Sequence, residues 1–316
     1  MYKTIYLAGG CFWGLQAYFS RLKGVLTEVG YANGDTFDTD YKKIKETNHA
    51  EVIKIVYDPL IIRTAEIIDR FFEIIDPFSK NRQKNDIGIQ YRSGIFYPSC
   101  DIDIERIANL FNGYIEKINN KKSEVIIEPI KNYVKAEEYH QDYLLKNPNG
   151  YCHIDFKNVN DSISTFKKLS SNEIKKLNLD EKSYNIMIKK DTEEPHESSF
   201  NLNYSKGLYV DKISKEPLFL SDDKYDAGCG WPSFTRPIFS SALDYNDDFT
   251  IPDRKRTEVV SKIQNSHLGH VFPAINVKTE TGLRYCINGY SLCFIEYDKL
   301  KDTPYEKYQF YFKSND

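Results

Sequence analysis

TIYLAGGCFWG, residues 4–14, is the stretch that decides how the first part of this chain folds. Residues 4–8 are a short run of β-favouring side chains that stops at two glycines. After the glycines, apolar side chains recur at helical spacing at Phe12, Leu15, Phe19 and Leu22. The stretch therefore predicts a strand, a tight glycine turn and a helix, with Cys11 at the turn.

After this strand, turn and helix, predicted strands and helices alternate along the sequence up to about residue 155. Further strands are predicted over residues 51–57, 94–97 and 125–130, and helices over residues 64–75 and 102–118. Such alternation is typical of an α/β or α+β domain. We predict that residues 1–155 form an α+β domain, a two-layer sandwich around a mixed sheet.

The rest of the sequence divides into a linker and a second domain. Residues 156–183 are rich in Ser, Asn and Lys, and SSNE at 170–173 has the form of a capping box. A linker with one short helix is therefore predicted. Residues 184–316 carry short β-like runs between Gly, Pro, Asn and Asp turns, which predicts a mainly β domain of antiparallel sheets, small and barrel-like.

Composition and charge narrow the class of protein. The 316 residues are 41% hydrophobic and 14% aromatic, which is enough for two packed cores. A formal charge of -3 gives no reason to expect nucleic acid or an anionic membrane as a partner. No apolar run approaches the roughly 20 residues that span a bilayer, and the N-terminus lacks the features of a secretory signal. A cytoplasmic protein is expected.

The cysteine pattern favours reactive thiols over structural ones. The six cysteines lie at positions 11, 100, 152, 229, 286 and 293, and no two have Cys-x-x-Cys spacing. Structural zinc sites usually draw on such short pairs, and disulfide scaffolds belong to small secreted domains. We expect a mixture of reactive thiols and inert ones, with Cys100 and Cys293 among the inert.

Cys11 has the local sequence of a reactive thiol. At a helix N-terminus, unpaired backbone N–H groups and the helix dipole stabilise a thiolate. The only two tryptophans, Trp13 and Trp231, each follow a cysteine by two residues. An indole there would give an apolar wall for a methyl or thioether group. The alternative, that both are ordinary core residues, stays open at this point.

Four motifs give the first domain a family resemblance. They are GCFWG at 10–14, HAEV at 49–52, YDP at 57–59 and QYRS at 90–93. Over residues 4–155 the sequence resembles methionine sulfoxide reductase A. The resemblance implies that Cys11 is the nucleophile. It implies that the sulfoxide oxygen is surrounded by Glu51, Tyr41, Tyr91 and Asp86, and that the methyl group is held by Phe12 and Trp13.

The chemistry explains these residue types. A thiolate that attacks a sulfoxide sulfur leaves an oxygen that must be protonated, which suits a carboxylic acid and phenols. For Glu51 to donate, burial must raise its pKa. The alternatives are that Glu51 ends a strand in solvent and that Tyr41 and Tyr91 are structural, since the chain has 24 tyrosines.

A second thiol must resolve the oxidised cysteine. After the attack Cys11 would carry a sulfenic acid, the first step of cysteine oxidation. Cys152, in NGYC at 149–152, matches a resolving position found in part of the family.

The second domain has its own motifs. DAGCGWPSF at 226–234, HLGHVFP at 267–273 and RYCIN at 284–288 make residues 184–297 resemble methionine sulfoxide reductase B. The resemblance implies that Cys286 is the nucleophile and Cys229 the resolving thiol. It further implies an oxygen-binding set of His267, His270 and Asn288, a methyl pocket shaped by Trp231, and an Arg284 that holds Cys286 as thiolate.

No metal is expected in this domain. His267 and His270 are three residues apart with no carboxylate in their motif, which makes a weak metal site. Many B-type reductases carry two Cys-x-x-Cys pairs for structural zinc. The corresponding stretches here are YVDKIS at 209–214 and SKIQNS at 261–266, without cysteine, so we predict no zinc.

The two resemblances together imply a fusion of peptide methionine sulfoxide reductases A and B. The first domain would reduce the S epimer and the second the R epimer, one enzyme for each. Each would pass through a sulfenic acid to an intradomain disulfide, which thioredoxin, or dithiothreitol in vitro, reduces. The expected substrates are free methionine sulfoxide and oxidised proteins, which the enzyme would repair. No bound cofactor is expected.

Two other classes of protein compete with this interpretation. A cysteine hydrolase or acyltransferase needs an oriented Cys–His pair. His49 lies near Glu51 in sequence, but His140 and His153 belong to no supporting motif. A redox-sensing module without catalysis would form disulfides under peroxide and turn over no sulfoxide.

Overall fold

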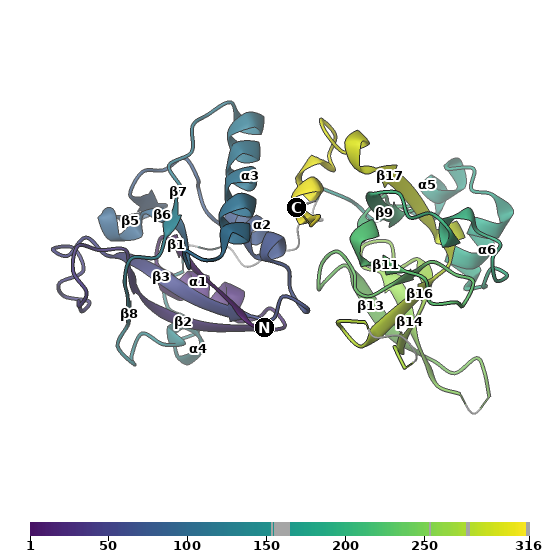
Figure 1. The fold of residues 1–316 in the computed structure, drawn as a ribbon, viewed down its shortest axis with the longest axis horizontal. Coiled ribbons are helices and arrows are strands. Elements are labelled where there is room, and N and C mark those ends of the chain that lie inside the picture. Colours follow the sequence, from purple (N-terminus) through teal and green to yellow (C-terminus); the bar gives the residue numbers. More distant parts are fainter. Residues whose placement is uncertain (153, 155–164, 253, 276–278, 314–316) are drawn as a thin grey trace. The chain divides into compact units, whose positions relative to one another are not determined.

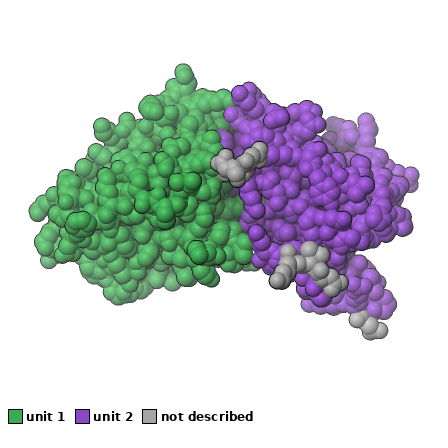
Figure 2. Space-filling model, viewed as in Figure 1, with its two compact units in different colours: residues 1–162 green, residues 163–316 purple. Residues whose placement is uncertain are grey.

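The computed structural model describes residues 1–152, 154, 165–252, 254–275 and 279–313. The chain divides into two compact units, Met1–Ser162 and Ile163–Asp316 (Figure 2). The predicted limits of the linker, residues 156 and 183, stay predictions. His153 and residues 155–164 lie outside the described part of the chain.

The first unit is built on a six-stranded mixed sheet (Figure 1). Its strands, in order across the sheet, are β7 (Ile126–Pro129), β6 (Ser93–Tyr97), β1 (Lys3–Gly9), β3 (Ala50–Tyr57), β2 (Val25–Ala32) and β8 (Tyr133–Lys135). Only the β6–β7 pair is parallel among these neighbours. The predicted mixed sheet of an α+β domain is confirmed.

Helices and a small ribbon complete this unit. They are α1 (Phe12–Phe19), α2 (Thr64–Ile74), β4 (Arg82–Gln83), β5 (Asp86–Ile87), η1 (Ile89–Tyr91), α3 (Ile102–Asn119) and α4 (Tyr143–Lys146). Figure 1 shows α3 alongside α2, and the two helices meet through stacked rings of Phe72 and Phe111. The apolar spacing that predicts both helices is the spacing that buries them against each other and the sheet.

The predicted strand, turn and helix around Cys11 are present. Gly10 has a φ of 84°, a left-handed conformation that a side chain would strain, so it makes the turn between β1 and α1. α1 begins at Phe12 with Cys11 as N-cap, and ends at Phe19, before Leu22. The observed helix is therefore about one turn shorter than the apolar spacing predicts.

The second unit is mainly β, as predicted. Its strands are β9 (Gly207–Asp211), β10 (Pro217–Leu220), β11 (Lys224–Tyr225), β12 (Ser233–Phe234), β13 (Leu243–Asp248), β14 (Arg256–Ser261), β15 (His267–Pro273), β16 (Leu283–Ile287) and β17 (Leu292–Glu296). They form two antiparallel sheets, with the orders β10-β9-β17 and β11-β12-β16-β15-β14-β13. Within the described residues, β11 and β13 end the larger sheet and do not pair, so the sheets are open and form no closed barrel.

Short helices flank these sheets. They are α5 (Ser171–Lys176), α6 (Glu181–Lys189), η2 (Ser199–Asn201), η3 (Ser221–Asp223), η4 (Gly289–Ser291), η5 (Tyr297–Lys299) and η6 (Glu306–Tyr311). The predicted capping box is present at the start of α5, where Ser170 and Glu173 bond each other's backbone N–H. In the described part of the chain, no helix is long and apolar enough to cross a membrane.

Candidate active sites

Cys11 lies at the start of α1, buried beside a carboxyl group. The thiol is 7% exposed and accepts hydrogen bonds from the backbone N–H groups of Trp13 and Gly14. Burial, and then the charge of Glu51, raise the pKa of Cys11 well above its usual range, while the two N–H groups lower it. The stabilisation predicted for a helix N-terminus is present, but burial outweighs it, and an ionised Glu51 opposes the thiolate further.

Glu51 is one of two acids whose charges act on this thiol. It lies on β3, is 2% exposed, and its Oε2 accepts the backbone N–H of Phe12 at 3.1 Å. Burial, with a smaller contribution from the charge of Asp86, raises the pKa of Glu51 to about 8, against the lowering effect of the Phe12 N–H. The carboxyl is therefore protonated at neutral pH and able to donate. The alternative of a solvated strand end is wrong.

Two phenol side chains lie beside Cys11 and Glu51. The hydroxyls of Tyr41 and Tyr91 are hydrogen-bonded to each other, and both rings lie near enough to Cys11 and Glu51 to sense their charges. Burial first, and then the charge of Glu51, raise the pKa of both phenols. The structure thus brings together the groups predicted to surround the sulfoxide oxygen.

Asp86 and Tyr151 lie at the same site. The Asp86 carboxylate accepts the backbone N–H of Cys11 and the hydroxyl of Tyr151, and burial raises its pKa. Sequence reasoning does not find Tyr151. The only available signal is its place beside Cys152.

Aromatic rings line the apolar side, and one histidine lies among them. The indole Nε1–H of Trp13 donates to His140 Nδ1 at 3.1 Å, and the indole stacks on Tyr143 at a centroid distance of 3.8 Å. His140 also packs against Phe12 and Tyr41, with centroids 5.2 and 4.6 Å away. Trp13 is therefore held in one orientation. The sequence gives His140 no supporting motif, so its place here is a finding.

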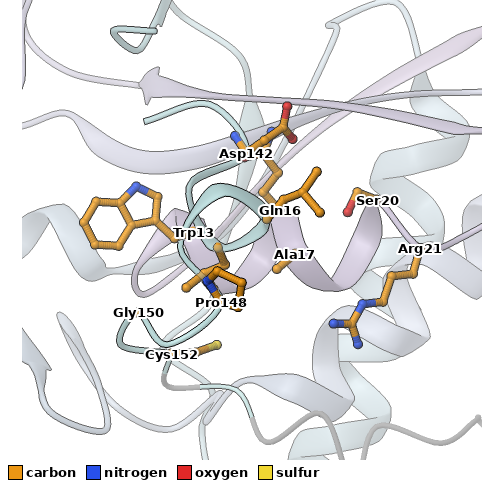
Figure 3. Close-up of a pocket in the computed structure, with 11 residues that line it drawn as sticks. Trp13, Gln16, Ala17, Ser20, Arg21, Asp142, Pro148, Gly150 and Cys152 are labelled. Atoms are coloured by element: carbon orange, nitrogen blue, oxygen red, sulfur yellow. The ribbon is translucent and has the colours of Figure 1, made fainter. Parts of the chain in front are cut away.

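Cys152 lies in a groove beside α1. The groove has a volume of about 600 Å³ and is lined by Trp13, Gln16, Ala17, Ser20, Arg21, Asp142, Leu144, Leu145, Pro148, Gly150 and Cys152. Figure 3 shows Trp13 and Arg21 at opposite ends of the view, with the Cys152 sulfur between them. Cys11 and Cys152 are both free thiols. Burial raises the pKa of Cys152, and Lys84 and Arg21 lower it.

In the second unit, two cysteines face each other. The Sγ atoms of Cys229 and Cys286 are 3.7 Å apart, and Ser233 Oγ lies 3.3 Å from Cys229 Sγ. The hydrogen bond between the thiols lowers the pKa of Cys229 to about 5 and, together with burial, raises that of Cys286. Arg284 lowers the pKa of both. This places the charge on Cys229, whereas the resemblance implies Cys286 as nucleophile. The two thiols lose their first proton as a pair, and transfer of the remaining proton to Cys229 would make Cys286 the thiolate.

Both histidines of the second unit are paired with carboxylates. His267 Nδ1 lies 2.7 Å from Glu258 Oε1, and His270 Nε2 lies 2.7 Å from Asp248 Oδ2. An ionised carboxylate only accepts, so the ring nitrogen that faces it carries the proton. Burial lowers the pKa of each histidine, and its carboxylate partner raises it. Neither partner is predicted from the sequence.

The remaining predicted residues of the second unit are held by hydrogen bonds and a ring contact. Asn288 is 2% exposed and donates from Nδ2 to the carbonyl of Leu268 at 3.1 Å. Trp231 donates from Nε1 to the carbonyl of Glu193 at 3.1 Å. The Arg284 guanidinium lies over the ring of Phe272, 5.0 Å from its centroid.

Comparison with known families decides the identity. A family model described as peptide methionine sulfoxide reductase matches residues 3–171, more than half of the chain. The chain belongs to this family. A second model, the SelR domain, matches residues 179–296, so the chain joins an A-type and a B-type methionine sulfoxide reductase.

Solved structures similar to this reductase cover about half of the chain. Mxr1 from Saccharomyces cerevisiae in reduced form is 41% identical over 48% of this chain and 88% of that chain, with a TM-score of 0.45. Methionine sulfoxide reductase A of Corynebacterium diphtheriae is 34% identical over 48% of this chain and 77% of that chain, with a TM-score of 0.44. Mxr1 in complex with Trx2 is 31% identical over 45% of this chain and 84% of that chain, with a TM-score of 0.33.

The two families establish what the fusion does. It is an enzyme with two methionine sulfoxide reductase activities, both of which depend on thiols. A role in the repair of oxidised proteins under oxidative stress is consistent with both.

The SelR domain of this reductase does not fit a structural zinc ion. The turns that replace the Cys-x-x-Cys pairs are joined by Glu216, whose Oε1 and Oε2 accept the backbone N–H of Ile263 at 3.1 and 2.9 Å. Glu216 Oε1 also accepts the N–H of Gln264, and Asp211 Oδ1 accepts those of Ile213 and Ser214. Backbone N–H groups thus occupy these carboxylates, and thiolates are missing. Nor do the described residues contain a cluster of three or more His, Cys, Asp or Glu able to hold a metal.

Proposed function

We propose that the site around Cys11 reduces the S epimer of methionine sulfoxide and the site around Cys286 reduces the R epimer. Each sulfoxide sulfur is a stereocentre, so one chiral pocket serves one epimer. We assign residues 1–155 and 184–316 to the two catalytic domains, joined by a linker, and place the protein in the cytoplasm, where thiols are kept reduced.

In the first step the Cys11 sulfur attacks the sulfoxide sulfur. The sulfoxide oxygen leaves with the proton of Glu51 and passes to the Cys11 sulfur, so methionine is released and Cys11 becomes a sulfenic acid. The thiol proton restores the Glu51 carboxyl. Tyr41 and Tyr91 donate hydrogen bonds to the oxygen, and Phe12 and Trp13 hold the methyl group. The assignment rests on a buried Glu51 carboxyl that accepts the N–H of Phe12, the residue after Cys11, and whose pKa is raised by burial.

Resolution then requires a second thiol. The Cys152 thiol attacks the Cys11 sulfenic acid, which forms a disulfide and releases water. Because the two thiols are free, residues 150–152 must bring Cys152 to Cys11. We propose that the groove beside α1 gives thioredoxin access to this cysteine. The yeast relative Mxr1 has been solved in complex with Trx2.

The second domain follows the same sequence of steps with less movement. Cys286 attacks the sulfoxide, and His267, His270 and Asn288 bind and protonate the oxygen while Trp231 packs on the methyl group. Arg284 favours the thiolate. Cys229 lies 3.7 Å from Cys286 and resolves the sulfenic acid to a disulfide that thioredoxin, or dithiothreitol in vitro, reduces. No bound cofactor and no zinc take part in either domain.

Separate assays of the two epimers test the assignment. Wild type, Cys11→Ser and Cys286→Ser are supplied with thioredoxin and either pure epimer. We expect Cys11→Ser to lose only S turnover and Cys286→Ser only R turnover. Loss of both activities in one variant, or retention of R turnover in Cys286→Ser, would show that the chemistry is assigned to the wrong sites.

A further inference from the structure

Glu193 is a buried carboxylate of the second unit to which the proposed mechanism gives no role. It lies in the segment between α6 and β9 and is 5% exposed. Residues 193–196, here called the strap, contact the loop that carries Cys229 and the turn that follows the Cys286 strand. A buried carboxylate is costly unless its oxygens are hydrogen-bonded, so its partners indicate what it stabilises.

The side chain of Glu193 fixes the loop that follows Cys286. Its Oε1 accepts the backbone N–H of Gly289 at 2.8 Å, and its Oε2 accepts that of Tyr290 at 2.9 Å. These N–H groups begin η4, directly after Asn288. Hydrogen bonds to an ionised group are the stronger kind, so the carboxylate holds this turn closely.

The backbone of Glu193 sets the orientation of the Asn288 amide. Its N–H donates to Asn288 Oδ1 at 3.1 Å, and Asn288 Nδ2 donates one of its hydrogens to Leu268. One acceptor position of the amide oxygen is therefore filled, and the second N–H of Nδ2 is the donor that Asn288 can present to a ligand. A sulfoxide oxygen is an acceptor, which matches this donor.

The strap also holds the loop of the resolving cysteine. The Glu193 carbonyl accepts the Trp231 indole N–H at 3.1 Å, and the His196 N–H donates to the Gly230 carbonyl at 2.8 Å. Gly230 has a φ of 87°, and a Cβ there would lie 2.8 Å from Pro195 Cβ. The strap and the loop are thus closely packed.

We propose that Glu193 is a positioning residue of the R-epimer site, which fixes Asn288 and Trp231 relative to Cys286. This rests on the proposed function of that site. Glu193 acts through the residues it holds and touches no reacting atom. Its charge works against the nucleophile, because it contributes to raising the pKa of Cys286. The benefit of the residue is therefore geometric.

Full-length Glu193→Ala, Glu193→Gln and the control Glu194→Ala test this, with dithiothreitol as reductant. Glu194 is the exposed neighbour. Misplacement of about 1 Å at a site costs up to ~100-fold in rate, so we expect Glu193→Ala to lose about 10- to 100-fold in kcat/KM for the R epimer. Glu193→Gln accepts one of the two N–H groups and should lose less. The control should stay within about two-fold, and S turnover by the same chains should be unchanged.

Thiol reactivity separates positioning from a purely structural role. In a Cys229→Ser background, Glu193→Gln should move the midpoint of Cys286 alkylation by iodoacetamide to lower pH, since a negative charge is removed. In the chain with both cysteines, the same substitution should slow sulfoxide reduction. We therefore expect Glu193→Gln to increase the fraction of Cys286 present as thiolate and, at the same time, to slow reduction of the R epimer.

R turnover by Glu193→Gln equal to that of Glu194→Ala would overturn the proposal, even if Glu193→Ala fails to fold. If Cys286→Ser keeps R turnover, the proposed function fails instead. If Cys286→Ser loses R turnover and the Glu193 variants keep it, only this inference fails.

Discussion

Among single residues, Glu51 has the clearest consequence for pH. The acid must be protonated to donate to the sulfoxide oxygen, and burial raises its pKa to about 8. The S activity should therefore be retained below that pH and decline as pH rises through about 8. Protonation also removes the negative charge that opposes the Cys11 thiolate.

Glu51→Gln should remove this decline of S activity at alkaline pH. A general acid contributes about 100- to 10,000-fold, so kcat for the S epimer should fall within that range and lose its decline near pH 8. The R activity of the same chain is the control for folding and concentration. A variant that keeps wild-type S turnover would show that the proton comes from elsewhere.

His140 gives a second prediction at this level. Its Nδ1 accepts the Trp13 indole N–H, so this nitrogen carries no proton, and burial lowers the pKa of His140 below the usual range of histidine. Protonation at acidic pH would turn Nδ1 into a donor and break the bond to Trp13. We expect KM for the S epimer to rise at acidic pH, once His140 becomes protonated, while KM for the R epimer serves as reference.

His140→Ala should show the raised KM at every pH. The missing hydrogen bond is worth about 1 kcal/mol, so the expected change is about five-fold. A wild-type KM for His140→Ala would mean that Tyr143 stacking alone holds the indole.

Among the elements, the turns of residues 211–216 and 261–266 are joined by the Glu216 carboxyl. Burial, and then the charge of Asp211, raise its pKa from 4.5 to about 7. Between pH 4.5 and about 7, Glu216 is protonated in the folded unit and ionised in the unfolded chain. The free energy of unfolding contributed by Glu216 is therefore largest below about pH 4.5 and is lost as pH rises through 7.

Glu216→Gln should weaken the dependence of the free energy of unfolding on pH. One backbone N–H loses its acceptor, which costs about 1–3 kcal/mol, and the fall in Tm of the second unit between pH 5 and 8 should shrink. Glu296→Gln, at an exposed carboxylate, is the matched control. Calorimetry at several pH values measures both. An unchanged pH dependence in Glu216→Gln would show that other groups titrate.

The same turns predict the effect of metal removal. Because carboxylates and N–H groups join them, EDTA should leave Tm and R turnover unchanged, and the purified protein should carry no stoichiometric zinc. One zinc per chain by elemental analysis would contradict the proposed absence of the metal.

The elements also show what the sequence can and cannot predict. The β1 turn and α1 follow from glycines and apolar spacing, so Cys11 is placed correctly. The β4–β5 ribbon has two-residue strands, too short for any periodicity, so the surroundings of Asp86 are not predicted. Glu258 and Glu193 are brought to the second active site by strand register and loop packing. Local sequence patterns carry no information about these long-range contacts, so neither residue is predicted.

For the whole molecule, the division into two units predicts that the activities are lost independently. Each unit has its own core: Phe71 is fully buried in the first, and Phe219 is fully buried in the second, stacked on Phe234 at a centroid distance of 4.4 Å. A Phe→Ala change in such a core costs about 3–5 kcal/mol of unfolding free energy. Phe219→Ala should therefore lower the temperature at which R turnover is lost and leave that of S turnover unchanged, and Phe71→Ala should do the reverse. The measurement is residual activity toward each epimer after heating at a series of temperatures. If either variant lowers both temperatures equally, the units unfold as one cooperative body, and the stability of each active site depends on the other half of the chain.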